Sequence, residues 1–228
     1  MKFAVGDSHV AFFAQSNLTK SYWMGCTYTA TIYQLLEKGL NIFNLKEEVL
    51  NSAHYIDIGI PDWQCTNGIF NTPNIDINDE IIFCYGFNDI QKNIYKYSKE
   101  NPEGTLNFLL EGYIRTISRY IHFYKIKCSV LSIPPVPLPS PIEGKYNNGI
   151  FGDFEALGSD EERIEYTKYA NKILENLCIK NDIKFINIYN IISDDNGFIK
   201  KEYTTDYVHL DSSNIELKNK ISERLSAL

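Results

Sequence analysis

The sequence contains no long apolar run. None of its uninterrupted apolar stretches approaches the roughly 18 residues that a membrane-spanning helix requires. The first short apolar run opens at Phe3, which leaves no room for a secretory signal peptide. If the chain is complete, we therefore expect a cytoplasmic protein without a membrane span.

Cysteine and histidine are scarce, and neither is spaced as in a metal site. The chain has five cysteines without a Cys-x-x-Cys pair, and four histidines without a pair at ligand spacing. Cys84 and Cys128 lie inside apolar, strand-like runs, which predicts that both are small buried side chains in a reducing compartment. This pattern argues against a zinc site and against a disulfide framework.

Positive charge is not in excess, and the common nucleotide-binding motifs are missing. The net charge is -7, and no stripe of Lys or Arg stands out that could neutralise phosphates, so we expect neither a nucleic-acid partner nor an anionic membrane surface. The chain also lacks a Gly-x-x-x-x-Gly-Lys-Ser/Thr loop, a Gly-x-Gly-x-x-Gly fingerprint and a Gly-x-Ser-x-Gly elbow. These absences favour a mechanism without a cofactor.

Short apolar strands and amphipathic helices alternate along the whole sequence. Strands are predicted over residues 3–6, 18–23, 80–85, 128–133 and 183–189, and helices over 10–14, 27–38, 106–121, 160–179 and 213–225. Parallel neighbours need crossover helices, so this alternation indicates a central parallel sheet covered on both faces. With 228 residues, 44% of them hydrophobic, we expect a single domain over 1–228 with a three-layer α/β/α sandwich.

Other parts of the chain carry weaker patterns. A short helix is predicted over residues 44–53, and residues 54–78 are predicted to be mostly loop. Residues 140–159 are also loop-like, and we expect the Pro- and Gly-rich segment 134–158 to line or cover a substrate pocket, because it leaves the carboxyl end of a strand.

The first predicted strand ends in Gly6-Asp7-Ser8, a tight turn that places a serine hydroxyl where open α/β sheets bind their ligands. Ser8 is therefore a candidate nucleophile. The alternative is an ordinary strand-to-helix turn in which Ser8 caps the helix. The strand over 80–85 ends in a second polar turn, Gly86-Phe87-Asn88-Asp89.

A third polar turn stands before the last helix and contains Asp206-x-x-His209. If this stretch is a turn, the Asp206 carboxylate can reach the His209 ring and fix its tautomer. Alternatively, Asp206 caps a helical turn and His209 is a half-buried ring. Three polar turns on one sheet that can converge favour a shared site.

The set of motifs resembles the SGNH (GDSL-type) hydrolases, whose blocks match Gly6-Asp7-Ser8, Gly25, Gly86-x-Asn88-Asp89 and Asp206-x-x-His209 in order. The resemblance covers nearly the whole chain and implies a flavodoxin-like sandwich and a serine esterase. It implies Ser8 as the nucleophile, His209 as the general base and acid, and Asp206 as the orienting carboxylate. The oxyanion hole would comprise the backbone N–H groups of Ser8 and Gly25 and the side-chain amide of Asn88.

A subgroup associated with glycan and capsule modification has Gly-Asp-Ser-His followed downstream by Trp-x-Gly-x-x-Thr. This chain is similar to that subgroup, since it contains Gly-Asp-Ser-His and its residues Trp23 to Thr29 approximate the second motif. His9 lies outside the basic family pattern; we expect it to sit at the helix start, with substrate contact as the alternative. The leading hypothesis is hydrolysis of an acyl ester, with an O-acetyl or other O-acyl group on a glycan as the candidate substrate. The alternatives are O-acyl transfer to or from a glycan and a non-catalytic glycan-binding module.

Overall fold

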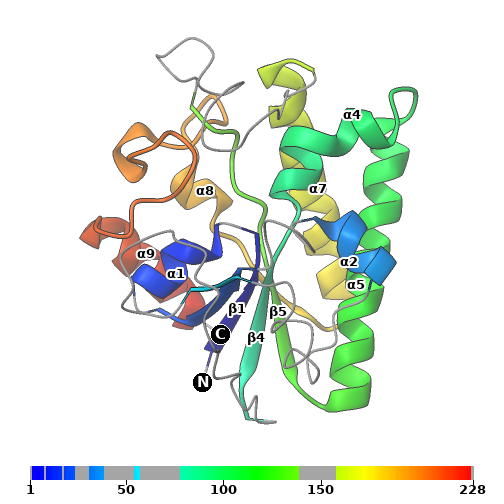
Figure 1. Ribbon diagram of the computed structural model, residues 1–228, viewed down its shortest axis with the longest axis horizontal. Helices are drawn as coiled ribbons and strands as arrows, with labels where there is room; N and C mark the ends of the chain where they lie inside the picture. Colours follow the sequence, from blue (N-terminus) through cyan, green and yellow to red (C-terminus); the bar gives the residue numbers. More distant parts are fainter. Residues whose placement is uncertain are drawn as a thin grey trace.

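The computed structural model describes residues 2–7, 9–16, 18–23, 31–38, 54–56, 78–138 and 158–226. Within them, one six-stranded sheet has the order β3-β2-β1-β4-β5-β6 (Figure 1). Its strands are β1 (Lys2–Gly6), β2 (Lys20–Trp23), β3 (His54–Ile56), β4 (Glu80–Cys84), β5 (Lys127–Leu131) and β6 (Lys184–Ile186).

The neighbouring strands β2, β1, β4, β5 and β6 pair in parallel, which confirms the parallel sheet predicted from the sequence. Without β3, their spatial order is second, first, third, fourth and fifth along the chain, which is the flavodoxin-like order. β3 pairs with β2 in the antiparallel direction and lies at the edge of the sheet. This short strand falls in the segment 54–78, which the sequence predicts as mostly loop.

Helices cover both faces of the sheet and form the outer layers of an α/β/α sandwich (Figure 1). One layer contains α2 (Ile32–Lys38), α5 (Pro102–Tyr124) and α7 (Asp160–Lys180), and the other contains α1 (Val10–Gln15) and α9 (Ile215–Ser226). Shorter helical segments are the π-helix η1 (Asp89–Asn93), α4 (Ile94–Tyr97), α8 (Tyr189–Ile192) and the 3-10 helix η2 (Lys201–Tyr203). The helix predicted over 44–53 lies outside the described residues.

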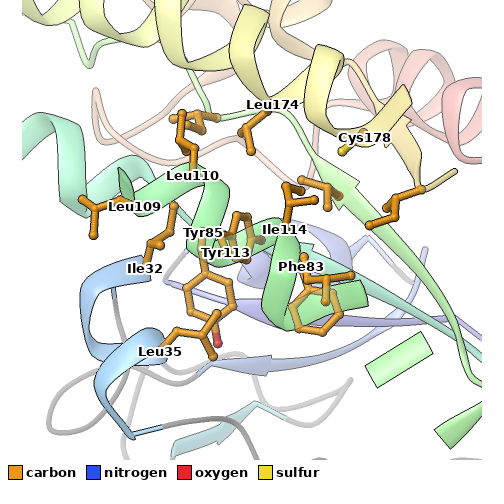
Figure 2. Close-up of a cluster of buried hydrophobic side chains, with 14 of the residues drawn as sticks. Ile32, Leu35, Phe83, Tyr85, Leu109, Leu110, Tyr113, Ile114, Leu174 and Cys178 are labelled. Carbon is orange, nitrogen blue, oxygen red and sulfur yellow. The ribbon is translucent and has the colours of Figure 1, made fainter. Parts of the chain in front are cut away.

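Alternating residues of the central strands supply the two hydrophobic cores. In β4, Ile81 and Phe83 face the layer of α2, α5 and α7, whereas Ile82 and Cys84 face the layer of α1 and α9. Figure 2 shows the first core, where Tyr113 of α5 lies among side chains of β4, α2 and α7. The predicted burial of Cys84 and Cys128 is confirmed, and both thiols are free.

The two longest helices begin where their sequences supply hydrogen-bond acceptors. The Asn101 side chain accepts from the N–H of Gly104 at the start of α5, and Pro102 follows it, where a missing N–H costs nothing. α7 opens with a capping box in which Ser159 and Glu162 satisfy each other's backbone N–H groups. None of the helices in the described ranges is long and apolar enough to cross a membrane.

Candidate active site

The carboxyl ends of β1 and β4 meet at the point where the strand order reverses, which is where open α/β sheets bind ligands. The chain leaves β1 through Asp7 and His9 and leaves β4 through Tyr85 to Asp89. The backbone N–H of Asp7 donates to the carbonyl of Cys84 at 3.2 Å and so fixes the two exits side by side. Two of the polar turns predicted from the sequence therefore share one edge of the sheet.

The third turn holds Asp206 against His209. Oδ1 of Asp206 accepts the backbone N–H groups of Val208 at 2.9 Å and His209 at 2.7 Å, while Oδ2 lies 2.7 Å from Nδ1 of His209. Tyr207 between them has a φ of 69°, which closes the turn. The carboxylate-to-ring contact predicted from the spacing is present, and the same carboxylate also caps the turn.

This pairing defines which nitrogen of His209 can act as a base. Burial raises the pKa of Asp206, but the interactions of its carboxylate with the His209 ring and with the backbone N–H groups outweigh this effect. Together they hold the pKa of Asp206 well below its usual range. An ionised carboxylate only accepts, so Nδ1 of His209 carries the proton and Nε2 carries the lone pair. His209 is 8% exposed, and burial lowers its pKa below 6.5, which favours the neutral form of the ring at pH 7.

His9 joins the third turn to the other two. Its ring centroid lies 5.2 Å from that of His209 and 4.1 Å from that of Phe87, the residue before Asn88. His9 does precede α1, as the sequence predicts, but its side chain is buried between the turns and not merely placed at a helix start. Ser8 and Gly25 lie outside the described residues, so their assignments stay predictions.

Asn88 stands at the start of η1, directly after Phe87, and is half-buried. Its carbonyl accepts a hydrogen bond from the side-chain amide of Asn93 at 2.8 Å. That contact spans five residues, as the wider π-helical turn does, and it anchors the backbone that carries the Asn88 side chain. The sequence predicts a polar turn here but contains no signal for the π-helix.

Asp89 lies at the edge of the site, and the sequence does not predict its role. The residue is 1% exposed, and its carboxylate accepts from the backbone N–H groups of Ile32 at 2.7 Å and Tyr33 at 3.2 Å and from the hydroxyl of Tyr97 at 3.3 Å. It therefore ties the start of α2 to the turn that carries Asn88. Burial outweighs these hydrogen bonds and raises the pKa of Asp89 to about 6.

This raised pKa makes a stability prediction. An unfolded chain binds the same proton with a pKa of about 3.9, so between roughly pH 4 and pH 6 the folded state holds more protons than the unfolded state. The contribution of Asp89 to the free energy of unfolding thus falls as the pH rises through this window. Asp89→Asn removes the titration, so we expect the difference in unfolding free energy, wild type minus variant, to shrink from pH 4 to pH 6.

Urea unfolding at several pH values measures this difference. Asp182→Asn is the matched control, because Asp182 is exposed and asparagine tolerates its left-handed backbone. If the difference in unfolding free energy between the wild type and Asp89→Asn stays constant with pH, the raised pKa of Asp89 is contradicted.

The segment after β5 runs toward the same edge. The carbonyl of Val136 accepts from the N–H of Ile199, and the N–H of Leu138 donates to the carbonyl of Tyr207 at 3.0 Å. Its start is held by Asn171 of α7, whose side chain bonds both the N–H and the carbonyl of Ile133. Residues 139–157 lie outside the described residues, so the pocket-covering role of segment 134–158 stays a prediction.

Metal chemistry has no donor set in the part of the chain that the structure describes. None of its groups of His, Cys, Asp and Glu gathers three or more members that could hold an ion. The side chains that converge at the sheet edge instead provide a proton acceptor on an imidazole, an oriented carboxylate and an amide-bearing turn.

Comparisons with known proteins give a likeness in structure only. No family model matches the chain, and neither does any curated protein. The fold matches a Streptococcus pneumonia protein provisionally described as a platelet activating factor, with a TM-score of 0.56, 19% identity and coverage of 100% of this chain and 83% of that one. It also matches a GDSL-like lipase from Bacteroides thetaiotaomicron, with a TM-score of 0.52, 16% identity and coverage of 100% and 88%.

A third match is a Bacteroides fragilis protein provisionally described as an acylhydrolase, with a TM-score of 0.54, 19% identity and coverage of 99% of this chain and 86% of that one. At these identities the likeness concerns the fold. The chain has the fold of the SGNH (GDSL-type) hydrolases, the family that its four short motifs resemble.

Proposed function

We propose that this protein is a serine ester hydrolase in which Ser8 is the nucleophile, His209 the general base and acid, and Asp206 the carboxylate that orients it. The observation that carries the proposal is the Asp206–His209 pair, 2.7 Å apart, whose imidazole packs 5.2 Å from the ring of the residue that follows Ser8. The turn after β1 and the turn before α9 therefore come together, although about 200 positions separate them in the chain.

The protonation state of this pair suits the first step. A serine hydroxyl is a weak nucleophile until a neighbouring base takes its proton, and Nε2 of His209 carries the lone pair that can accept it. In acylation, the Ser8 oxygen attacks the ester carbonyl carbon while its proton passes to Nε2. When the tetrahedral intermediate collapses, the bond to the alcohol oxygen breaks and that oxygen takes the proton from His209.

The developing oxyanion needs fixed donors. We assign this role to the backbone N–H groups of Ser8 and Gly25 and to the side-chain amide of Asn88. Asn93 and Asp89 hold the turn of Asn88 in place through their hydrogen bonds, so the amide needs little reorganisation during the reaction. In deacylation, water gives a proton to Nε2, attacks the acyl carbon and releases the acid, and Ser8 regains its proton.

An O-acyl group on a glycan is the substrate class that we propose. Tyr33 is 45% exposed and stacks on Tyr97 with ring centroids 5.0 Å apart, and both residues are bonded to Asp89, next to Asn88. An exposed aromatic face near the turn that carries Asn88 is suited to packing against a sugar ring.

A fluorophosphonate probe tests the nucleophile. We expect it to label the folded wild type at Ser8 and to leave Ser8→Ala unlabelled, because phosphonylation needs a serine activated by a base. Peptide mass spectrometry locates the label, and Ser118→Ala, a serine on α5 whose hydroxyl bonds the carbonyl of Ile114, is the matched control. A folded wild type without label would favour the non-catalytic binding module, and equal labelling of Ser8→Ala would refute the assignment.

A further inference from the structure

The site contains a second aspartate–histidine pair. Nδ1 of His9 lies 3.0 Å from Oδ1 of Asp7, and the same oxygen accepts the backbone N–H of His9 at 3.0 Å. Both side chains are deeply buried, with 4% of His9 and 2% of Asp7 exposed. A buried carboxylate requires a hydrogen-bond partner of this kind. The pair therefore belongs to the protein interior and is not a surface contact.

The two pairs share one design. In each, a carboxylate holds both the backbone N–H and the Nδ1 of a histidine that follows it in a tight turn, two residues later for Asp7 and three for Asp206. Each ring is thereby fixed in orientation and tautomer. Among the described residues, Nε2 of His9 has no hydrogen-bond partner, so its ring meets the site through packing.

The contacts of the His9 ring lead directly to His209. Its centroid lies 5.2 Å from that of His209 with an angle of 43° between the planes, and Phe87 packs against it at 4.1 Å. His209 could not tilt toward His9 without displacing this ring. The position of the proposed base therefore depends on the turn that also carries the proposed nucleophile.

Charge couples the two rings as well. Two imidazolium rings this close repel each other, so a proton on either one opposes a proton on the other. The described charged and titratable groups that act on His209 are Asp206, which favours its protonated form, His9, which disfavours it, and Asp7, which favours it. His9 thus opposes the two carboxylates.

We propose that His9 is a positioning residue for His209: its buried ring, anchored by Asp7, packs against the imidazole of His209 and opposes its protonation. The catalytic meaning of this role rests on the function proposed above, whereas the coupling of the two rings does not. His9 touches neither the ester nor the water in this scheme and acts only through His209.

Two replacements remove the charge of His9, one with the aromatic ring kept and one with the ring lost. His9→Phe keeps an aromatic ring against Phe87 and His209 but cannot bind a proton, and His9→Gln removes both the ring and the proton. In both variants we expect the acidic limb of the kcat/KM profile for a short-chain aryl ester to move to higher pH, by about 1 pH unit. His122→Gln, an exposed histidine on α5, is the matched control and should leave the profile unchanged.

NMR titration of the His209 ring, identified with His209→Gln, tests the coupling without substrate. We expect its midpoint to rise in the His9 variants relative to the wild type. Equal midpoints in the wild type and the variants would overturn the proposal. Each variant gives its own reading if the other does not fold, and an inactive protein whose His209 midpoint rises in the His9 variants would overturn the esterase proposal alone.

Discussion

We expect His209→Gln to lower kcat/KM for a short-chain aryl ester by about 10⁴–10⁶-fold, the range found when a triad histidine is removed from a serine hydrolase. Glutamine is uncharged and cannot take the proton of Ser8, so both acylation and deacylation lose their base. The remaining rate should come from the oxyanion donors and from substrate binding alone. Initial rates over a range of substrate concentrations measure the effect.

The fold should survive this replacement. His209 lies in a turn whose backbone is held by Asp206, and Oδ1 of Asp206 bonds the main-chain N–H groups of residues 208 and 209 whatever side chain position 209 carries. The thermal midpoint should therefore stay close to that of the wild type. His122→Gln should retain full activity, and a folded His209→Gln variant within tenfold of the wild type would remove His209 from the mechanism.

The parts of the fold that depend on local patterns could be predicted from the sequence. β4 is buried on both faces, and its apolar run with high β propensity shows this directly in the letters. The long helices follow their three- and four-residue apolar spacing, and the structure has α7 and α9 within two residues of the predicted bounds. The Asp206–His209 contact was predictable because a turn of that spacing brings the carboxylate within hydrogen-bond distance of the histidine ring.

Features set by distant residues could not be predicted in this way. The strand predicted over 183–189 ends at Ile186. The reason is Ser132, which directly follows the neighbouring strand β5: its hydroxyl accepts the N–H groups of Ile188 and Tyr189, where α8 begins. His9 is a similar case: nothing in its neighbours along the chain reveals that its ring packs against His209. The spacing Asp7-x-His9, which parallels Asp206-x-x-His209, is the one signal that could have indicated the second pair.

We expect Gly6→Ala to lower the free energy of unfolding by more than about 3 kcal/mol, at the upper end of the cost of overpacking. The reason is the close approach of two strands. A Cβ atom at position 6 would lie 1.9 Å from the carbonyl oxygen of Cys84 in β4, and that oxygen also accepts the N–H of Asp7. β1 and β4 would have to separate where the Asp7 turn begins. For a chain of this length, the thermal midpoint should fall by about 10 °C.

Gly6 does not have a positive φ, so position 6 requires a glycine for space and not for a left-handed backbone. Gly112→Ala in α5 is the matched control, because the added Cβ would meet only the end of the Leu36 side chain, with Cδ1 at 2.7 Å and Cδ2 at 3.1 Å, and alanine is the better helix former by about 1 kcal/mol. Unfolding of both variants in urea separates a general glycine effect from the clash in the sheet. If Gly6→Ala were as stable as Gly112→Ala, the β1–β4 spacing, and with it the placement of the Asp7–His9 pair, would have to differ from that described above.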